Sequence, residues 1–240
     1  MKTVVIIQAR MGSTRLPGKI LLPLGDKVVL DYSVSRCRMV EELSDVIVAT
    51  STLPADDAVA EWCKLRGVSC FRGSQDDVLS RYYECAKMVK PDYIIRVTSD
   101  CPFVDYEMIR DIIECMKQEQ RDIVVHDHEP ARGLWSEIIS FEALEYIHLH
   151  GHEDRHREHV TYYAYEHAGQ FKRHVYKLPE LLRHPEFRIT LDTPEDYDML
   201  KEIAGKFPGT AISSKEVVRY LVEHPEIAAI NGHIKQKPVI

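Results

Sequence analysis

Short apolar runs alternate with amphipathic segments through the first half of the chain. The runs at 3–7 and 45–50 are nearly continuous, which is typical of strands buried on both faces of a parallel sheet. Between such runs the apolar positions recur at helical spacing, and the 54–66 segment has proline and acids in its first turn and Gly67 after its end. The pattern predicts strands at 3–7, 45–50, 68–71, 93–97, 123–125 and 187–191, and helices at 28–38, 54–66, 78–89, 106–118, 194–207 and 214–224.

This alternation of strands and helices predicts the fold class. Right-handed crossovers between parallel strands would give a three-layer α/β/α sandwich around a mostly parallel, Rossmann-like sheet. Between about 126 and 185 the pattern changes to histidine-rich, aromatic and basic stretches, before a strand and two helices complete the chain. We therefore predict a single domain over 1–240, with an excursion at about 126–185.

Histidines are concentrated in that excursion. His152, His156 and His159 fall at i, i+4 and i+7, so they could share a helical face and bind a metal. Solvated or hydrogen-bonded histidines are the commoner arrangement, and no cysteine or paired carboxylates accompany these three. The metal interpretation is therefore the less favoured one.

Composition and charge exclude several classes of partner. The 240 residues have a formal net charge of −7, whereas non-specific binding to nucleic acid needs a basic surface. The six cysteines include no Cys-x-x-Cys pair, which favours a reducing compartment. The N-terminus lacks a signal-peptide h-region, and no apolar run approaches the roughly 20 residues that cross a bilayer. We predict a cytoplasmic protein without a nucleic-acid or membrane partner.

The first predicted strand leads into a basic, glycine-containing loop. It is not a P-loop, because Gly12 and Gly18 enclose five residues instead of four and Ile20 replaces the hydroxyl residue. Gly12 and Ser13 could nevertheless let backbone N–H groups converge on an anion. Arg10, Arg15 and Lys19 add three cations within ten residues. A solvated basic loop is the alternative, but this combination at a strand end favours a polyphosphate site.

Polar residues also follow other predicted strands, at Thr50 and Asp100. Ligands of open α/β sheets bind beyond the carboxyl ends of the strands, so these residues should lie near the loop. Asp100 could instead form only an Asx turn, and Asp192 could be a helix N-cap. However, Pro194 prefers the first helical position, which makes Thr193 the N-cap and leaves Asp192 free to face the site.

Residues 9–19, ARMGSTRLPGK, closely resemble the signature of the sugar nucleotidyltransferases, particularly the cytidylyltransferases that make CMP-activated acidic sugars. The resemblance covers most of the chain and continues in VIVAT (46–50), FRGSQDDVLSRYYE (71–84), IRVTSDCPFVD (95–105), SFEALE (140–145), REHVT (157–161) and LDTPEDYDML (191–200). It implies the GT-A-like fold of nucleotide-diphospho-sugar transferases and the Mg²⁺-dependent activation of a sugar or sugar acid by CTP, with release of pyrophosphate, for a surface polysaccharide. It also implies a homodimer, with the 126–185 excursion binding sugar or forming the dimer contact.

The resemblance also implies roles for individual residues. Catalysis would fall to Arg10, Arg15, Lys19, Asp100 and Asp192, of which the two aspartates would hold Mg²⁺. The nucleotide would be bound by Ala9, Arg10, Met11, Gly12, Ser13, Lys19, Thr50, Arg72, Ser74, Arg81 and Asp100. The acceptor sugar would be bound by Trp135, Glu137, Arg157, Glu158 and His159. No protein nucleophile is needed, because nucleotidyl transfer depends on positioning and charge neutralisation.

One departure leaves other functions open. Relatives commonly read G-L-D-V-E where this chain has Gly133–Glu137, so Trp135 replaces an aspartate; the change could alter the acceptor or remove sugar recognition. A glycosyltransferase of similar architecture is a second possibility, but its usual D-x-D metal motif is absent from the expected strand end. The string Asp196-Tyr197-Asp198 falls inside a predicted helix. A non-catalytic relative is the third.

Overall fold

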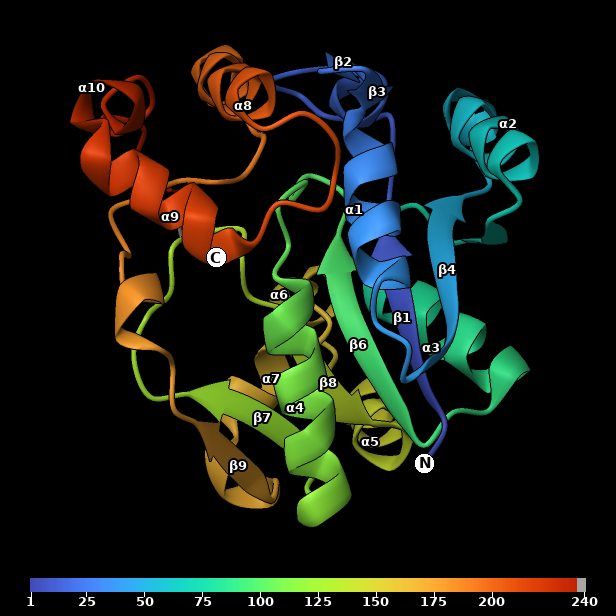
Figure 1. The fold of residues 1–240 in the computed structure, drawn as a ribbon. Coiled ribbons are helices and arrows are strands. Elements are labelled where there is room, and N and C mark those ends of the chain that lie inside the picture. Colours follow the sequence, from blue (N-terminus) through green and yellow to red (C-terminus); the bar gives the residue numbers. More distant parts are fainter. Residues whose placement is uncertain (237–240) are drawn as a thin grey trace.

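The computed structural model describes residues 1–236, and in this range the chain forms one seven-stranded sheet, a two-stranded ribbon and helices on both faces of the sheet (Figure 1). The strands are β1 (Thr3–Gln8), β2 (Pro23–Leu24), β3 (Lys27–Val28), β4 (Leu43–Ser51), β5 (Ser69–Gly73), β6 (Tyr93–Thr98), β7 (Ile123–His126), β8 (Glu137–Ser140) and β9 (Arg173–Tyr176). The helices are α1 (Val29–Arg38), α2 (Asp57–Arg66), α3 (Val78–Val89), α4 (Tyr106–Gln118), α5 (Phe141–His150), α6 (Asp154–Glu158), α7 (Tyr162–Glu166), α8 (Pro194–Lys206), α9 (Ser214–Glu223) and α10 (Pro225–Ala228). Short 3₁₀ turns are η1 (Lys19–Leu21), η2 (Pro54–Asp56), η3 (Ala168–Gln170) and η4 (Glu180–Leu182).

The main sheet is mostly parallel, as the sequence predicts. Its strand order is β5-β4-β1-β6-β8-β7-β9, and β8 alone among these strands runs antiparallel to both of its neighbours. β1 lies at the centre between β4 and β6, in parallel register with both. The carboxyl ends of β1, β4 and β6 therefore meet at one edge of the sheet.

The apolar side chains form one core on each face of the sheet. Along β1, Val5 and Ile7 point into the core that includes α1, α4, α8 and α9, while Val4 and Ile6 point into the core that includes α3, α5 and α7. Because successive strand residues face opposite sides, a nearly continuous apolar run is what a strand covered on both faces requires. Figure 1 shows α1 and α4 in front of the sheet and α3 and α5 behind it. The three-layer prediction is confirmed.

The predicted strand at 187–191 is wrong. Among residues 1–236, this stretch joins no sheet and makes one isolated bridge, between Arg132 and Arg188. Its backbone bonds go instead to irregular chain: Ile189 N–H donates to Arg132 O over 2.8 Å and Leu191 N–H to Asp100 O over 2.8 Å. The apolar pattern correctly indicated burial of Ile189 and Leu191, but burial alone does not produce a strand ladder.

The segment at 126–185 contributes to the main sheet. It supplies β8, which pairs with β6, and the edge strand β9, which pairs with β7. Both strands are short and only partly apolar, so they give little period-2 signal in the sequence. Helices α5, α6 and α7 of the same segment lie on the face of the sheet that α3 covers.

The helices have no membrane-spanning character. Among residues 1–236, no helix combines the length and the apolarity that crossing a bilayer requires.

Gly133 supports the chain that leads to Asp192, and replacing it should be costly. Its φ is +95°, and an added Cβ would lie 2.7 Å from the carbonyl carbon of Ile189. We expect Gly133→Ala to lower the free energy of unfolding by about 2–4 kcal/mol, since backbone strain and overpacking each cost 1–3 kcal/mol. Urea unfolding followed by circular dichroism measures this. In Gly205→Ala, the matched control, the added Cβ meets nothing within 4 Å inside α8, so stability should rise by about 0.5–1 kcal/mol. A Gly133→Ala protein as stable as the wild type would contradict the expectation.

Candidate active site

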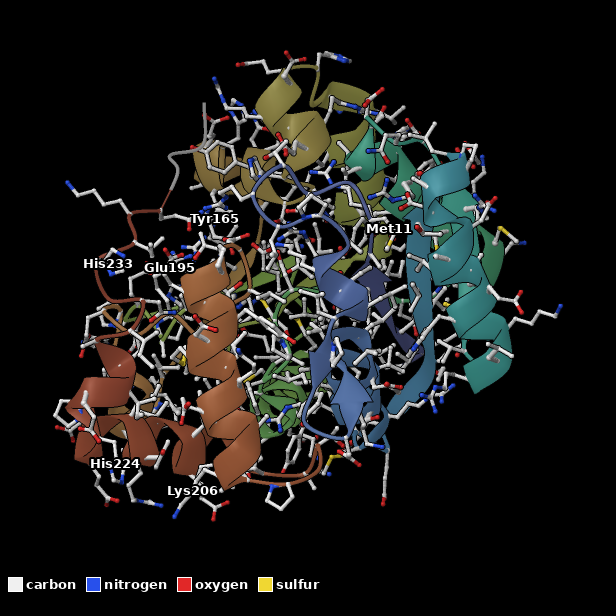
Figure 2. All side chains as sticks on the ribbon, turned by 90° about the horizontal axis from the view of Figure 1, so that it is seen from above. Met11, Tyr165, Glu195, Lys206, His224 and His233 are labelled. Carbon is white, nitrogen blue, oxygen red and sulfur yellow. The ribbon has the colours of Figure 1, made fainter. Side chains whose placement is uncertain are left out.

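The predicted polyphosphate loop lies at the carboxyl edge of the sheet. It leaves β1 after Gln8 and runs to η1, where Lys19 begins the first turn. Figure 2 looks down on the molecule from the side of this edge and labels Met11 in the loop and Glu195 in the first turn of α8. Lys19 of this loop contacts both Asp100 and Asp192, so three distant parts of the sequence meet at this end of the sheet.

The loop closes on itself through its own backbone. Gly18 has a φ of +69°, which favours glycine, and its N–H donates to Met11 O over 3.0 Å. Ser13 N–H donates to the same carbonyl over 2.9 Å. The expectation that the Ser13 amide is free for an anion therefore needs correction. The charge of the loop comes from its side chains, and Gly18, which the sequence interpretation did not stress, fixes its shape.

Asp56 anchors this loop to the end of β4. Its Oδ1 accepts from Met11 N–H over 2.6 Å, and its Oδ2 accepts from the N–H and the hydroxyl of Ser51. The side chain is almost fully buried. In the sequence, Asp56 looks like an ordinary acid in the first turn of a helix, so its positioning role was missed. Asp57 next to it fits the same pattern, and the sequence does not show which of the two has another role.

Lys19, Asp100 and Asp192 form the centre of the site. Lys19 Nζ lies 2.8 Å from Asp100 Oδ2 and 2.9 Å from Asp192 Oδ1, and it also donates to Leu191 O. Burial would lower the pKa of Lys19, but the two carboxylates more than offset this and raise its pKa above the ordinary value. The ammonium is therefore charged at neutral pH, and it joins two aspartates that lie 92 positions apart in the sequence.

Two arginines complete the charge around Asp192. Arg15 Nη2 lies 3.2 Å from Asp192 Oδ2, and Arg188 Nη2 lies 3.6 Å from the same oxygen. Burial alone would raise the pKa of Asp192, whereas Lys19, Arg15 and Arg188 together bring it below its usual value. Asp192 is thus held as a carboxylate in a partly buried position.

The helix that follows Asp192 begins as the sequence predicts. Thr193 is the N-cap of α8, and Asp196 completes a capping box with it, so Asp192 is not the cap. Sequence reasoning missed what else Asp196 does. Its fully buried carboxylate accepts from Arg188 at 3.2 and 3.1 Å, from Asn231 at 2.8 Å and from Asp192 N–H at 2.9 Å. Arg188, Asp196 and Asn231 form a scaffold that fixes the backbone of Asp192.

The predicted nucleotide residues at and beyond the carboxyl ends of β4 and β5 are largely tied to the protein. Arg72 donates to Ser51 O and Leu53 O, and Ser74 Oγ accepts from Asp77 N–H. Arg81 is 1 % exposed and donates to Ser74 O, but its Nε and Nη2 have no partner within residues 1–236. The Thr50 hydroxyl is buried and likewise lacks a partner in that range. Ala9 is fully buried beside this region and donates to Ala49 O.

The predicted acceptor residues do not form one cluster. Glu137 accepts from Arg96 over 2.6 Å, and Arg157 pairs with both oxygens of Asp77. The Trp135 ring packs against the core, and its centroid lies 5.0 Å from the ring centroid of His126 and 6.0 Å from that of Tyr176. The sequence predicts Trp135 as an acceptor contact, and its packing gives the partly buried ring a structural role as well.

Glu158 and Arg157 nevertheless lie beside the phosphate loop. Glu158 Oε1 is 3.9 Å from Arg10 Nη2. A cavity of about 290 Å³ is lined by Arg10, Asp76, Val78, Asp154, Arg157 and Glu158. Burial lowers the pKa of the nearby His159, so its imidazole is mostly neutral at neutral pH. The α6 helix therefore brings acceptor candidates next to one of the loop arginines.

The histidine-rich segment contains a different cluster from the one the spacing suggests. His156, Glu166 and His167 place ligand atoms within 4.8 Å of one another, whereas His152 and His159 are not part of that group. His156 Nε2 lies 2.5 Å from Glu166 Oε2, and Arg155 Nε lies 3.1 Å from the other oxygen. His156 Nδ1 is buried without a partner in residues 1–236, so it lacks the second hydrogen bond that metal-bound histidines usually make. Within this cluster, His156 and Glu166 are hydrogen-bonded to each other, and Arg155 pairs with the same carboxylate.

Comparisons with known proteins agree with this fold. The family model described as Cytidylyltransferase matches residues 4–226. Spore coat polysaccharide biosynthesis protein SpsF of Bacillus subtilis is 36% identical over 231 residues, which cover 93% of this chain and 95% of that protein. A solved cytidylyltransferase from Leptospira borgpetersenii superposes with a TM-score of 0.89 at 32% identity, covering 99% of this chain and all of that one. CMP:2-keto-3-deoxy-manno-octonic acid synthetase, solved with CTP, shares the fold with a TM-score of 0.65 at 17% identity, over 86% of this chain and 99% of that one.

Proposed function

The chain belongs to the cytidylyltransferase family and is a nucleotidyltransferase, and we propose that it activates a sugar or sugar acid with CTP. In this proposal a hydroxyl oxygen of the acceptor bonds to the α-phosphorus of CTP, and the bond between that phosphorus and the β-phosphate oxygen breaks. Pyrophosphate leaves, and a CMP-sugar for spore coat or another surface polysaccharide is the product. The reaction takes place in the cytoplasm, where CTP is available.

The proposal rests on one observation. Lys19 Nζ contacts both Asp100 and Asp192, and Lys19 is at the end of the loop that carries Arg10 and Arg15. Paired carboxylates beside a set of cations are what transfer from a triphosphate needs, since the triphosphate brings both a negative tail and a divalent ion. A simple solvated loop would not bring carboxylates from two distant parts of the chain onto its lysine.

The two aspartates suit Mg²⁺. Both present oxygens to a single cation, and hard oxygen donors from one or two carboxylates, completed by water and phosphate oxygens, are the ligands Mg²⁺ prefers. Asp100 and Asp192 would hold the ion. When bound there, Mg²⁺ would neutralise charge on the phosphate oxygens around the reacting phosphorus.

The loop cations would act on the leaving group. Arg10 and Arg15 are about one-third exposed, so their guanidinium groups can reach a ligand at the edge of the sheet. Arginine pairs with phosphate through two parallel N–H donors, which both orients the triphosphate tail and stabilises the charge that grows on pyrophosphate. Arg15 also pairs with Asp192 over 3.2 Å, so it links the loop to this carboxylate.

The remaining contacts of the proposal concern the base and the acceptor. Arg81 keeps two unpaired N–H groups in a buried position after β5, and such groups favour a polar ligand. CTP was bound by the octonic acid synthetase that shares the fold, which supports a pyrimidine here. Arg157, Glu158 and His159 would meet the acceptor at the α6 side, and the 126–185 segment would also serve a homodimer.

A glycosyltransferase is less well supported. The D-x-D string at 196–198 lies in α8, and Asp196 is buried in its pairing with Arg188, so it is not available to a metal. The alternatives of glycosyl transfer and of a non-catalytic relative become outcomes of the same experiment.

Thermal shift with each nucleoside triphosphate and Mg²⁺ tests the proposal. We expect CTP to raise Tm by about 5–10 °C at a hundredfold excess over Kd, because binding then stabilises by about 2.7 kcal/mol and proteins of this size shift 2–4 °C per kcal/mol. ATP and GTP should give little shift. Pyrophosphate release from CTP against a panel of sugars and sugar acids then identifies the acceptor.

The other outcomes separate the alternatives. A shift with nucleotide-sugars but not with CTP would indicate a glycosyltransferase. No shift with either class of ligand would indicate a non-catalytic relative, and equal shifts with all four triphosphates would remove the assignment to CTP.

A further inference from the structure

Lys19 has all of its hydrogen-bonding capacity committed to the protein. An ammonium group has three donors, and Nζ has three acceptors within reach: Asp100 Oδ2, Asp192 Oδ1 and Leu191 O. The side chain is only 10 % exposed. In this conformation no donor of Lys19 remains for a phosphate.

These three residues are assigned two tasks that conflict with this arrangement. The family resemblance assigns Lys19 to the triphosphate, and the proposed function assigns Asp100 and Asp192 to Mg²⁺. A divalent ion binds carboxylate oxygens at roughly 2.0–2.1 Å, but here one oxygen of each aspartate already faces Nζ at 2.8 and 2.9 Å. An ion among these oxygens would therefore lie against the ammonium, and like charges at such a distance repel strongly.

We propose that Lys19 is an internal occupant of the cation position, which a divalent ion displaces while the nucleotide phosphates receive the released ammonium. The inference rests on the proposed function and adds to it how the site is controlled: the ion and the triphosphate bind cooperatively, and each binds weakly alone. Lys19 is a positioning residue before the ligands arrive and a phosphate ligand afterwards.

The geometry around Lys19 permits the exchange. Its backbone is fixed by the loop closure at Gly18 and by η1, while four methylene groups separate Cα from Nζ. The ammonium can therefore move several ångströms without a change in the main chain. Arg10 and Arg15 lie on the same loop and mark the direction in which the phosphate tail would lie.

The contacts of Lys19 keep the two aspartates together in the ligand-free enzyme. Asp100 and Asp192 come from distant parts of the chain, and without a cation between them two carboxylates sharing one place would repel. Lys19 satisfies both in the ligand-free enzyme and lets a Mg²⁺–triphosphate complex take over. By linkage, the factor by which the triphosphate tightens ion binding equals the factor by which the ion tightens triphosphate binding.

Direct binding of Mn²⁺, measured as loss of the free-ion electron paramagnetic resonance signal in the absence of nucleotide, tests the proposal. Lys19→Gln removes the occupant, so we expect the Kd for Mn²⁺ to fall by about tenfold or more. Arg15→Gln is the charge-matched control: Arg15 touches only the outer oxygen of Asp192, so its effect should be clearly smaller. Lys27→Gln, on the exposed β2–β3 ribbon, should leave the Kd unchanged. Adding Asp100→Asn to Lys19→Gln should abolish the gain.

Several results would overturn the inference. An unchanged Kd in Lys19→Gln, or equal gains in Lys19→Gln and Arg15→Gln, would show that Lys19 does not occupy the ion position or that net charge alone matters. If Lys19→Gln does not fold, the ammonium resonance of Lys19 in wild-type protein replaces it: it should lose protection from exchange when saturating Mg²⁺ binds, and a persistent signal would equally overturn the inference. Wild-type turnover of CTP is unaffected by these outcomes, so the proposed function stands or falls separately.

Discussion

Replacing either central aspartate by asparagine should abolish Mg²⁺-dependent pyrophosphate release. We expect Asp100→Asn and Asp192→Asn each to lower turnover by about a thousandfold or more, the scale on which single groups that stabilise phosphoryl-transfer charge act. The amide keeps the shape of the side chain but offers one neutral oxygen, so it holds neither Mg²⁺ nor Lys19 firmly. Turnover is measured as pyrophosphate released from CTP with the acceptor that the sugar panel identifies.

The fold should survive both replacements. Lys19 keeps the other carboxylate and Leu191 O as acceptors in each single variant, so the loss of stability should be about 1–3 kcal/mol, as for one hydrogen bond to a charged group. Asp26→Asn, in the exposed β2–β3 turn, is a control for removing one carboxylate and should turn over normally. Near-normal activity in Asp100→Asn or Asp192→Asn would exclude that residue from the mechanism.

The sequence predicts the centre of this site because its parts lie at strand ends. Arg15 and Lys19 follow a strand with a strong apolar signature, and Asp100 follows another. Parallel strands bring their carboxyl ends to one edge, so order along the chain becomes proximity in space. Asp192 was predicted from a different signal, the capping pattern of Thr193 and Pro194. Because this pattern is local, it can be recognised without a structure.

The supporting contacts could not be predicted because they depend on packing between distant segments. Arg157 is predicted as a sugar contact, but in the structure it pairs with Asp77, 80 positions away. Trp135 is predicted as an acceptor contact, yet its ring packs beside His126 and Tyr176, on segments distant in the sequence. Strands β8 and β9 are too short for their apolar pattern to indicate the direction of β8 or the edge position of β9.

Asp196 shows most clearly what local reading leaves out. Its place three residues after Thr193 predicts the capping box, and that box is present. The same carboxylate also accepts from Arg188, on the extended chain before Asp192, and from Asn231, 35 positions further on. The capping signal fully explains an aspartate at this position, so nothing in the sequence points to a second role.

Removing the Asp196 carboxylate should therefore be severely destabilising. We expect Asp196→Ala to lower the free energy of unfolding by about 3–5 kcal/mol, because it leaves the 6 %-exposed Arg188 guanidinium without its principal partner. For a chain of this size the loss corresponds to a fall in Tm of about 6–20 °C. Calorimetry measures it. Because Asp192 N–H and Arg188 also lose their common acceptor, CTP turnover should fall even at temperatures where the variant is fully folded.

The neighbouring Asp198 provides the matched control on the same helix. It is mostly exposed and, within the described residues 1–236, pairs only with Lys201 one turn away, so Asp198→Asn should leave both Tm and turnover close to wild type. Arg188→Met would then separate the effect of charge from that of packing. In the double variant with Asp196→Ala, both the guanidinium and the carboxylate are removed. Its loss of stability should be smaller than the sum of the losses in the two single variants. An Asp196→Ala protein with wild-type Tm, or additive losses in the double variant, would show that the scaffold does not hold Asp192 through this pair.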